Sequence, residues 1–265
     1  MSDWEVYAVK YADRNNRPRA ESFILDLHHD SPHPMDYFVW VLRHEERVIL
    51  VDTGYDEAEA QRRGRDIVMD PREALKPLGI SAEAVDEVIV THLHYDHAGG
   101  LHLFPNARLH LQAAEMAFAT GPCMCHDVLR LPFTADHVCE AIQRLYAGKV
   151  IFHEGDAQIA DGVTVHCIGG HSRGLQCVRV KTEAGWMVLA SDAAHYYENM
   201  GKGKPFPIVV DVEEMMEGFK TMGRLASRRE LIVPGHDPMV RDVFATAMAP
   251  HIHRLDPGPI KEITL

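Results

Sequence analysis

Short runs of apolar residues separated by polar turns dominate the chain, and this pattern predicts a fold rich in β-strands. The run at residues 5–9 predicts an edge strand. Residues 37–43 and 47–52 predict a hairpin, because the polar segment 44–46 separates two β-rich runs. Further along, the Asp-Gly pair at 161–162 is a strong signal for a two-residue hairpin turn.

Helical patterns lie between these strand groups. Asp70 followed by Pro71 supplies an N-cap and a first-turn proline, so we expect a helix over residues 70–78. More helices are expected at residues 112–120 and 212–226, and a partly helical insertion at 121–148. Other strands are expected at 85–91, 107–111, 149–153, 157–160, 163–168, 175–180, 186–190 and 231–233. Strands followed by a helix, twice over, predict an α/β fold, which we expect to form one domain over residues 1–265.

Composition narrows the class of protein. With 265 residues, 46% of them apolar and 25% charged, the chain can bury a large core as a globular protein does. No window reaches the ~18 uninterrupted apolar residues of a membrane span, and the start of the chain lacks a signal-peptide pattern, so we expect a cytoplasmic protein without a membrane partner. Five cysteines, an odd number, make a disulfide framework unexpected, and a net charge of −12 argues against a nucleic-acid partner.

Histidine is unusually frequent, with 18 copies, roughly three times the usual share. The segment from residue 92 to 97 alone holds His92, His94, Asp96 and His97, at the end of a predicted strand. In an extended loop, residues two apart point the same way, so the first two histidines can share one ion while the other two residues face a neighbouring ion. This spacing predicts a metal site.

Three other candidate ligands, His171, Asp192 and His236, each follow a predicted strand. In layered α/β folds, residues just beyond the carboxyl ends of strands converge in one crevice, so we expect these side chains to meet the histidine-rich segment. Imidazole and carboxylate ligands without thiolate suit zinc, with iron, cobalt or manganese as alternatives. The expected cofactor is two zinc ions per chain.

The order His-x-His-x-Asp-His, a later His, an Asp and a final Gly-His resembles the metallo-β-lactamase superfamily from about residue 37 to residue 236. This resemblance implies a four-layer αβ/βα sandwich, with Asp52 in position to orient a ligand histidine. It also implies a ligand set: His92, His94 and His171 on one metal ion, Asp96, His97 and His236 on the other, and Asp192 bridging both.

Two metal ions can share a water and lower its pKa from 15.7 toward ~7, so a hydroxide that bridges them can attack an ester-like bond without a Ser or Cys nucleophile. Within the superfamily the chain looks closest to N-acyl homoserine lactonases, which are quorum-quenching enzymes, and to pyridoxolactonase-like enzymes. Those lactonases carry a Tyr three residues after the bridging Asp, where this chain has His195. We expect His195, or else Tyr196 or Tyr197, to contact the substrate, and the candidate catalytic residues are Asp96, His195 and Tyr196.

Other functions stay open at this point. A thioesterase of glyoxalase II type, a β-lactamase or a phosphodiesterase would use the same metals, an iron-dependent redox enzyme would use one iron, and a binding module would hold the metal structurally. The expected partner is a small-molecule lactone or ester, and the relatives suggest a homodimer. His251 and His253 are expected in an irregular terminal stretch, and Gly201–Lys204 in a flexible connector.

Overall fold

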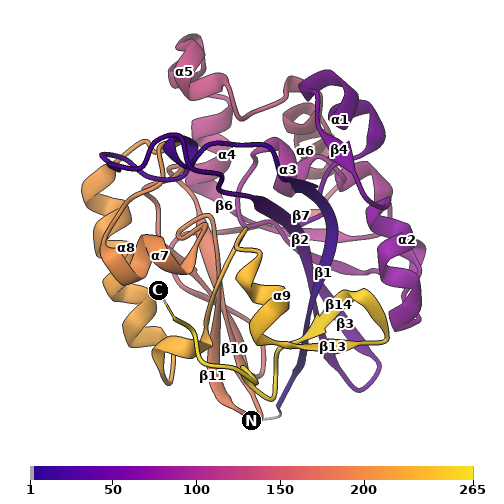
Figure 1. Ribbon diagram of the computed structural model, residues 1–265. Helices are drawn as coiled ribbons and strands as arrows, with labels where there is room; N and C mark the ends of the chain where they lie inside the picture. The colour runs from indigo at the N-terminus through magenta and orange to yellow at the C-terminus, as the bar shows by residue number, and fades with distance from the viewer. Residues whose placement is uncertain (1–2, 265) are drawn as a thin grey trace.

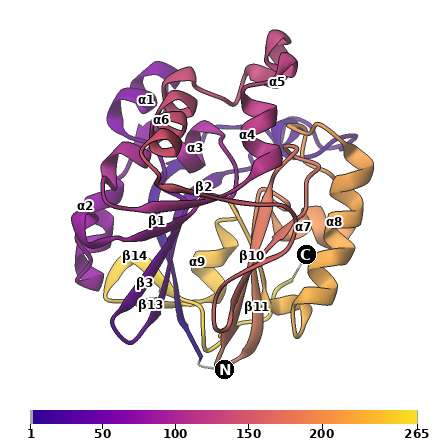
Figure 2. The same ribbon diagram turned by 180° about the vertical axis from the view of Figure 1, so that it is seen from behind.

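Two β-sheets pack face to face, and helices cover the outer face of each (Figures 1 and 2). The computed structural model describes residues 3–264. The layers therefore run helix, sheet, sheet, helix, and the four-layer αβ/βα sandwich predicted from the sequence is confirmed.

The first sheet mixes antiparallel and parallel pairs. Its strands β3, β5, β6 and β7 run parallel to one another, whereas the pairs on the other side of β3 are antiparallel. Along the sheet the order is β13 (Ala245–Ala247), β14 (Ala249–Arg254), β1 (Glu5–Arg14), β2 (Met35–His44), β3 (Arg47–Val51), β5 (Glu87–Ile89), β6 (Arg108–Gln112) and β7 (Val150–His153), with the short β4 (Asp66–Ile67) paired to β1.

The second sheet is antiparallel except for its β11–β12 pair. Its order is β12 (Ile232–Pro234), β11 (Gly185–Ser191), β10 (Gln176–Thr182), β9 (Val163–Cys167) and β8 (Ala157–Ala160). Ala160 pairs with Val163 across the turn 161–162, where Gly162 takes a φ of +80°. The hairpin predicted from the Asp-Gly pair is confirmed, since glycine enters this conformation without steric cost.

Several helices begin where the sequence offers a capping residue. The Asp70 carboxylate accepts a hydrogen bond from the Arg72 backbone N–H at the start of α2, as its sequence predicts. No helix among residues 3–264 has the length and apolar character that crossing a membrane requires. The α-helices are α1 (Glu57–Arg63), α2 (Pro71–Leu75), α3 (Tyr95–Ala98), α4 (Ala113–Ala119), α5 (Asp127–Arg130), α6 (Ala135–Tyr146), α7 (Tyr197–Lys202), α8 (Val212–Leu225) and α9 (Met239–Val243).

The central strands of the first sheet are apolar on both faces, because both faces are covered there. On β2, Trp40 and Leu42 face the second sheet. Val39 and Val41, which alternate with them along the strand, pack in the core that includes residues of α2 and α6. Successive side chains of a strand point to opposite faces, so one strand contributes to two cores. A third core lies between β10, β11 and α8.

Two expectations about the chain ends are wrong. Strand β1 is not an edge strand, because β14 pairs with it antiparallel and places Tyr7 opposite Arg254. His251 and His253 therefore lie in a regular strand and not in an irregular stretch. The terminal hairpin is short and polar, and its partner strand lies at the other end of the chain, so local pattern carries little signal for it. The connector assigned to Gly201–Lys204 also begins inside α7, which ends at Lys202.

The core between the sheets predicts a measurable stability difference. Replacing Leu42, which is fully buried there, by Ala should lower the free energy of unfolding by about 2–5 kcal/mol, because it removes buried methyl groups and leaves a cavity. The same substitution at Leu27, which is 88% exposed, should change it by less than about 0.5 kcal/mol. Urea unfolding at equal metal content would measure the free energy of unfolding of both variants. Equal losses in the two variants would contradict the core between the sheets.

Candidate metal centre

The predicted ligands lie in the loops that follow strands or, in two cases, on the short helix α3 after such a loop. His92 and His94 follow β5, and His94 is the residue before α3, which carries Asp96 and His97. His171 follows β9, Asp192 comes directly after β11, and His236 comes two residues after the end of β12. Both sheets thus send their strand ends to one edge of the sandwich, and the predicted ligands converge there.

Asp192 lies between two groups of histidines. Its Oδ1 lies 2.9 Å from Nε2 of His236 and 3.2 Å from Nε2 of His97. Its Oδ2 lies 3.1 Å from Nε2 of His171 and 3.7 Å from Nε2 of His92. One carboxylate oxygen therefore faces each group, which is the arrangement that a ligand shared by two metal ions needs.

The remaining predicted ligands complete the two groups. His94 Nδ1 lies 2.9 Å from His171 Nε2, and Asp96 Oδ2 lies 3.6 Å from His236 Nε2 and 3.7 Å from His97 Nε2. Within each group, the atoms that could bind a metal lie within 4.8 Å of one another, and all of these side chains are buried. These two groups are His92, His94, His171 and Asp192, and Asp96, His97 and His236; a third group, Asp192, His195 and His236, overlaps them.

The outer ring nitrogens of three histidines are held by hydrogen bonds. His97 Nδ1 lies 2.7 Å from Asp52 Oδ2, His171 Nδ1 lies 2.7 Å from the Ile208 backbone oxygen, and His236 Nδ1 lies 2.9 Å from the Asp36 backbone oxygen. Because each acceptor oxygen accepts a hydrogen bond from the Nδ1–H group, Nε2 is the ring nitrogen that faces the cluster and is placed to bind a metal. Among the described residues, Nε2 of His92 and of His97 is buried without a hydrogen-bond partner. These donors fit a pair of metal ions.

Burial and charge set the protonation of the cluster. Burial, with the neighbouring His97 and His171 respectively, holds the pKa of His92 and of His94 well below the usual value, so both rings are neutral, as metal ligands must be. Burial lowers the pKa of His97 too, but the nearby carboxylates, chiefly Asp192, more than offset this and raise it. Burial opposes ionisation of Asp192, yet the surrounding histidines hold its pKa well below the usual range.

A hydrogen-bonded network beneath the cluster joins the two sheets. Asp52, at the end of β3, accepts hydrogen bonds of 2.8 Å from both the backbone N–H and the hydroxyl of Thr91. The Thr91 hydroxyl lies 2.8 Å from that of Ser191, at the end of β11. Asp52 and Ser191 both have positive φ, at 61° and 47°, which is strained for residues other than glycine. The network holds this strained backbone directly beside the predicted ligands.

Glu115 is a functional residue that the sequence does not single out. It is fully buried on α4 and accepts hydrogen bonds from the Leu93 N–H (2.9 Å), the Ser172 hydroxyl (2.6 Å) and the Gly174 N–H (2.9 Å). Burial raises its pKa. The side chain ties the loop of His92 and His94 to the loop of His171. A lone Glu in a predicted helix is normally a surface residue, so no local signal reveals this role.

The three candidates for substrate contact take different places. His195 lines the same pocket as the metal cluster, with Nε2 2.9 Å from Asp192 Oδ2 and its ring stacked on Phe206 at a centroid distance of 3.4 Å. Burial lowers its pKa to about 3. The Tyr196 hydroxyl instead accepts a hydrogen bond from Arg17 Nη1 (2.5 Å) and donates one to the Pro34 backbone oxygen (3.2 Å), and Tyr196 is outside the pocket lining.

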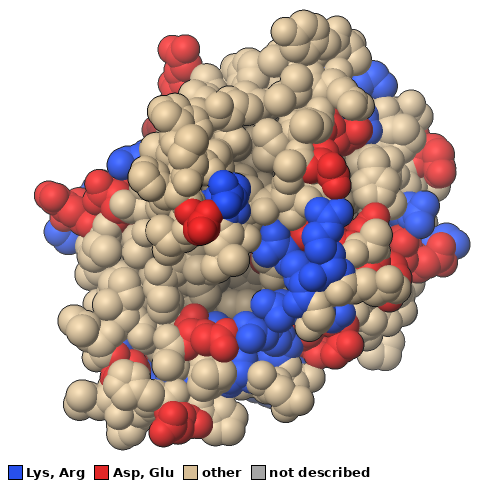
Figure 3. Space-filling view, turned by 90° about the horizontal axis from the view of Figure 1, so that it is seen from above, with Lys and Arg blue, Asp and Glu red and all other residues tan. Residues whose placement is uncertain are grey.

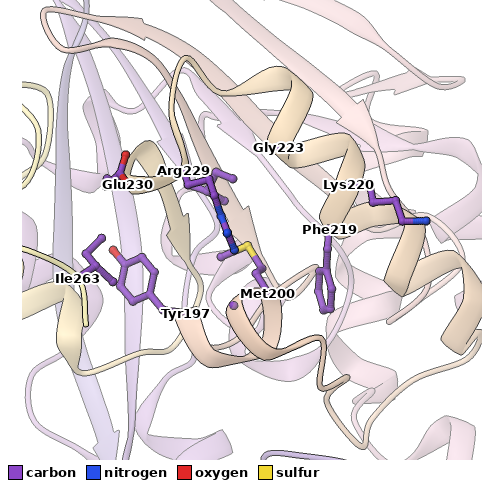
Figure 4. Close-up of a pocket in the computed structure, with 10 residues that line it drawn as sticks. Tyr197, Met200, Phe219, Lys220, Gly223, Arg229, Glu230 and Ile263 are labelled. Carbon is purple, nitrogen blue, oxygen red and sulfur yellow. The ribbon is translucent and has the colours of Figure 1, made fainter. Parts of the chain in front are cut away.

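Tyr197 belongs to a second cavity, of about 530 Å³, between α7, α8 and the carboxyl-terminal segment. Figure 4 shows its ring beside Ile263, with Met200 and Phe219 on other walls. The pocket at the metal cluster is smaller, about 280 Å³, and is lined by Asp96, His195 and most of the predicted ligands. Among residues 3–264, the side-chain groups able to hold a metal lie at this smaller pocket, which makes it the candidate active site.

The family model of the metallo-beta-lactamase superfamily matches residues 34–237, a stretch that contains every predicted ligand. The chain belongs to this superfamily. With its fold and its paired groups of histidine and aspartate side chains, it is a metal-dependent hydrolase.

Individual relatives narrow the comparison. An N-acyl homoserine lactonase of Bacillus cereus is 30% identical over 217 residues, covering 75% of this chain and 81% of the relative. A probable metallo-hydrolase of Mycobacterium tuberculosis is 25% identical, with 83% of each chain covered. The crystal structure of a quorum-quenching N-acyl homoserine lactone lactonase superposes with a TM-score of 0.72 at 25% identity, covering 90% of this chain and 94% of that one. The chain is thus similar to lactonases in sequence and in fold.

The contact between Asp52 and His97 predicts an effect on metal affinity. Asp52→Asn should weaken zinc binding by about 10- to 100-fold, because the ring loses the charged acceptor that orients it. Competition with a chromophoric chelator would measure the dissociation constant. The control is Asp127→Asn, because the Asp127 side chain is 91% exposed. This variant should bind zinc as tightly as the unmodified protein does. Equal affinities in both variants would show that Asp52 does not support the metal.

Proposed function

We propose that this protein is a lactonase that opens the ring of a lactone by hydrolysis at a pair of zinc ions. The ligands in this proposal are His92, His94 and His171 for one ion, Asp96, His97 and His236 for the other, and Asp192 for both. The placement of one Asp192 oxygen toward each group carries the proposal. The imidazole and carboxylate donor set, without thiolate, supports zinc.

Two metal ions in this site would supply Lewis acidity and a water molecule acidic enough to act as a nucleophile near neutral pH. The side chains of the protein prepare the site for this. The buried carboxylates provide the negative charge that retains divalent ions, and the hydrogen bonds to Asp52, Ile208 and Asp36 keep the imidazoles from turning. Addition of water to the lactone carbonyl and cleavage of the ring C–O bond give a hydroxy acid, which releases a proton.

The similarity to named relatives is the reason for proposing a lactone as the substrate and not another ester. The curated relatives at 29–30% identity are N-acyl homoserine lactonases. Each is covered over more than four fifths of its length, so the similarity extends well beyond the metal motif.

The first experiment is proton release by the zinc-loaded protein with a panel of lactones, beside a thioester, a β-lactam and a phosphodiester. We expect lactone turnover, and we expect Asp192→Asn to lower it more than about 100-fold because the shared ligand loses its charge. Asp156→Asn is the matched control and should keep full activity, because Asp156 is an exposed carboxylate that pairs with His166. If the protein hydrolyses the thioester, the β-lactam or the phosphodiester and no lactone, the lactonase assignment is wrong and that activity replaces it.

We also propose that His195 contacts the substrate. Its ring lines the pocket and is held in place by Asp192 and by Phe206, so it is oriented before the substrate arrives. His195→Phe should keep the zinc content and lower kcat/KM for the lactone by about 10- to 100-fold, the effect of losing a hydrogen bond to a polarised group. An unchanged kcat/KM would reject this role, and a loss of zinc would assign the histidine to the metal instead.

A further inference from the structure

Arginine is concentrated at the pocket of the metal cluster. Arg14, Arg17, Arg63 and Arg65 all line it, although the chain as a whole carries a net charge of −12. They come from the end of β1, the loop after it, the end of α1 and the segment between α1 and β4. Seen from above, Lys and Arg side chains form a band beside a hollow (Figure 3). This concentration of arginine contrasts with the negative net charge of the chain.

Two of these arginines are neutralised by the protein itself. Arg14 pairs with both oxygens of Glu21. Arg63 pairs with Glu59 and donates to the backbone oxygens of the segment that follows α5. Their charges hold the walls of the pocket together and leave little for a ligand.

Arg17 is buried, and its guanidinium is largely committed to structure. It donates to the Ser22 hydroxyl (2.6 Å), the Tyr196 hydroxyl (2.5 Å) and the Glu21 backbone oxygen (2.7 Å). It fixes the loop that covers Tyr196, so we assign it a structural role.

Arg65 differs from the other three. Arg14 and Arg17 have Glu21 within 4.0 Å and Arg63 has Glu59, whereas among residues 3–264 no carboxylate lies within 4.0 Å of the Arg65 guanidinium. Its Nε, like that of Arg17, is buried without a hydrogen-bond acceptor. Its backbone is fixed by a hydrogen bond of 2.8 Å from its N–H to the Ala60 oxygen. Burial lowers the pKa of Arg65, and the phenol groups around it, chiefly Tyr95, offset this so that the net pKa is raised. A partly buried cation thus lines the pocket without an anionic partner.

A guanidinium removed from water gains most from a planar anion, because a carboxylate can accept two parallel hydrogen bonds from it. Of the three carboxylates in the pocket wall, Asp96 and Asp192 are assigned to the metal ions in the proposed function, and Glu21 pairs with Arg14. Two divalent ions would make the pocket more positive still. An N-acyl homoserine lactone has no ionised group to pair with Arg65.

We propose that the preferred substrate of this pocket is a lactone that carries a carboxylate, and that Arg65 binds this carboxylate. This inference rests on the proposed function and adds the substrate class to it. Arg65 is then a specificity-determining residue, and it selects against the neutral lactones on which the named relatives act.

The test compares two probes, a γ-butyrolactone with a carboxylate on the carbon next to the ring oxygen, and the matching primary carboxamide. With the zinc-loaded protein, kcat/KM should be about 10- to 100-fold higher for the carboxylate, mainly through KM, as expected for a hydrogen bond between charged groups. Arg65→Met should bring this ratio close to one, and Arg65→Lys should give a ratio between the two. Arg62→Met is the control, because Arg62 lies outside this pocket and pairs with Asp136 on the surface.

The outcomes separate the two proposals. A ratio near one in the unmodified protein, or a ratio that both Arg65 variants leave unchanged, overturns the carboxylate assignment and leaves the lactonase intact. Turnover of neither lactone, at full zinc content, overturns the lactonase and the inference that rests on it. Circular dichroism checks that each variant is folded. If Arg65→Met does not fold, Arg65→Lys still decides the test.

Discussion

The Asp192 carboxylate is buried, ionised and placed between two groups of histidines, and the arrangement of the molecule follows from keeping it there. An isolated buried carboxylate is costly, so it needs positive charge or hydrogen bonds on both oxygens. Loops from both sheets supply the surrounding imidazoles, and Thr91 and Ser191 join the two sheets directly beneath. The αβ/βα sandwich serves this constraint, because it brings the ends of strands from two sheets to one edge.

Around this centre, the pocket wall is built from segments far apart in the sequence. The backbone of Asp36, at the start of β2, makes two hydrogen bonds with His236: its N–H donates to the His236 backbone oxygen, and its own oxygen accepts from the His236 ring. Phe206 stacks on His195 and forms another wall. In our proposals, the metal ligands carry the hydrolysis, whereas the wall, with Arg65 in it, selects the substrate.

Much of the fold and of the candidate site can be predicted from the sequence, for identifiable reasons. Ligand residues are dense and close in sequence at 92–97, and the other candidates follow strands with clear apolar patterns, so their convergence is predictable. Glu115 cannot be found this way, because its partners Leu93, Ser172 and Gly174 meet only in the folded chain. The pairing of β14 with β1 and the isolation of Arg65 are likewise tertiary properties, which depend on contacts across the whole chain.

The most direct test of this account is anomalous diffraction at the zinc absorption edge from crystals of the zinc-loaded protein. The account predicts two anomalous peaks, one beside His92, His94 and His171, the other beside Asp96, His97 and His236, with Asp192 between them. A single peak, or peaks elsewhere in the molecule, would contradict a dinuclear centre at this site.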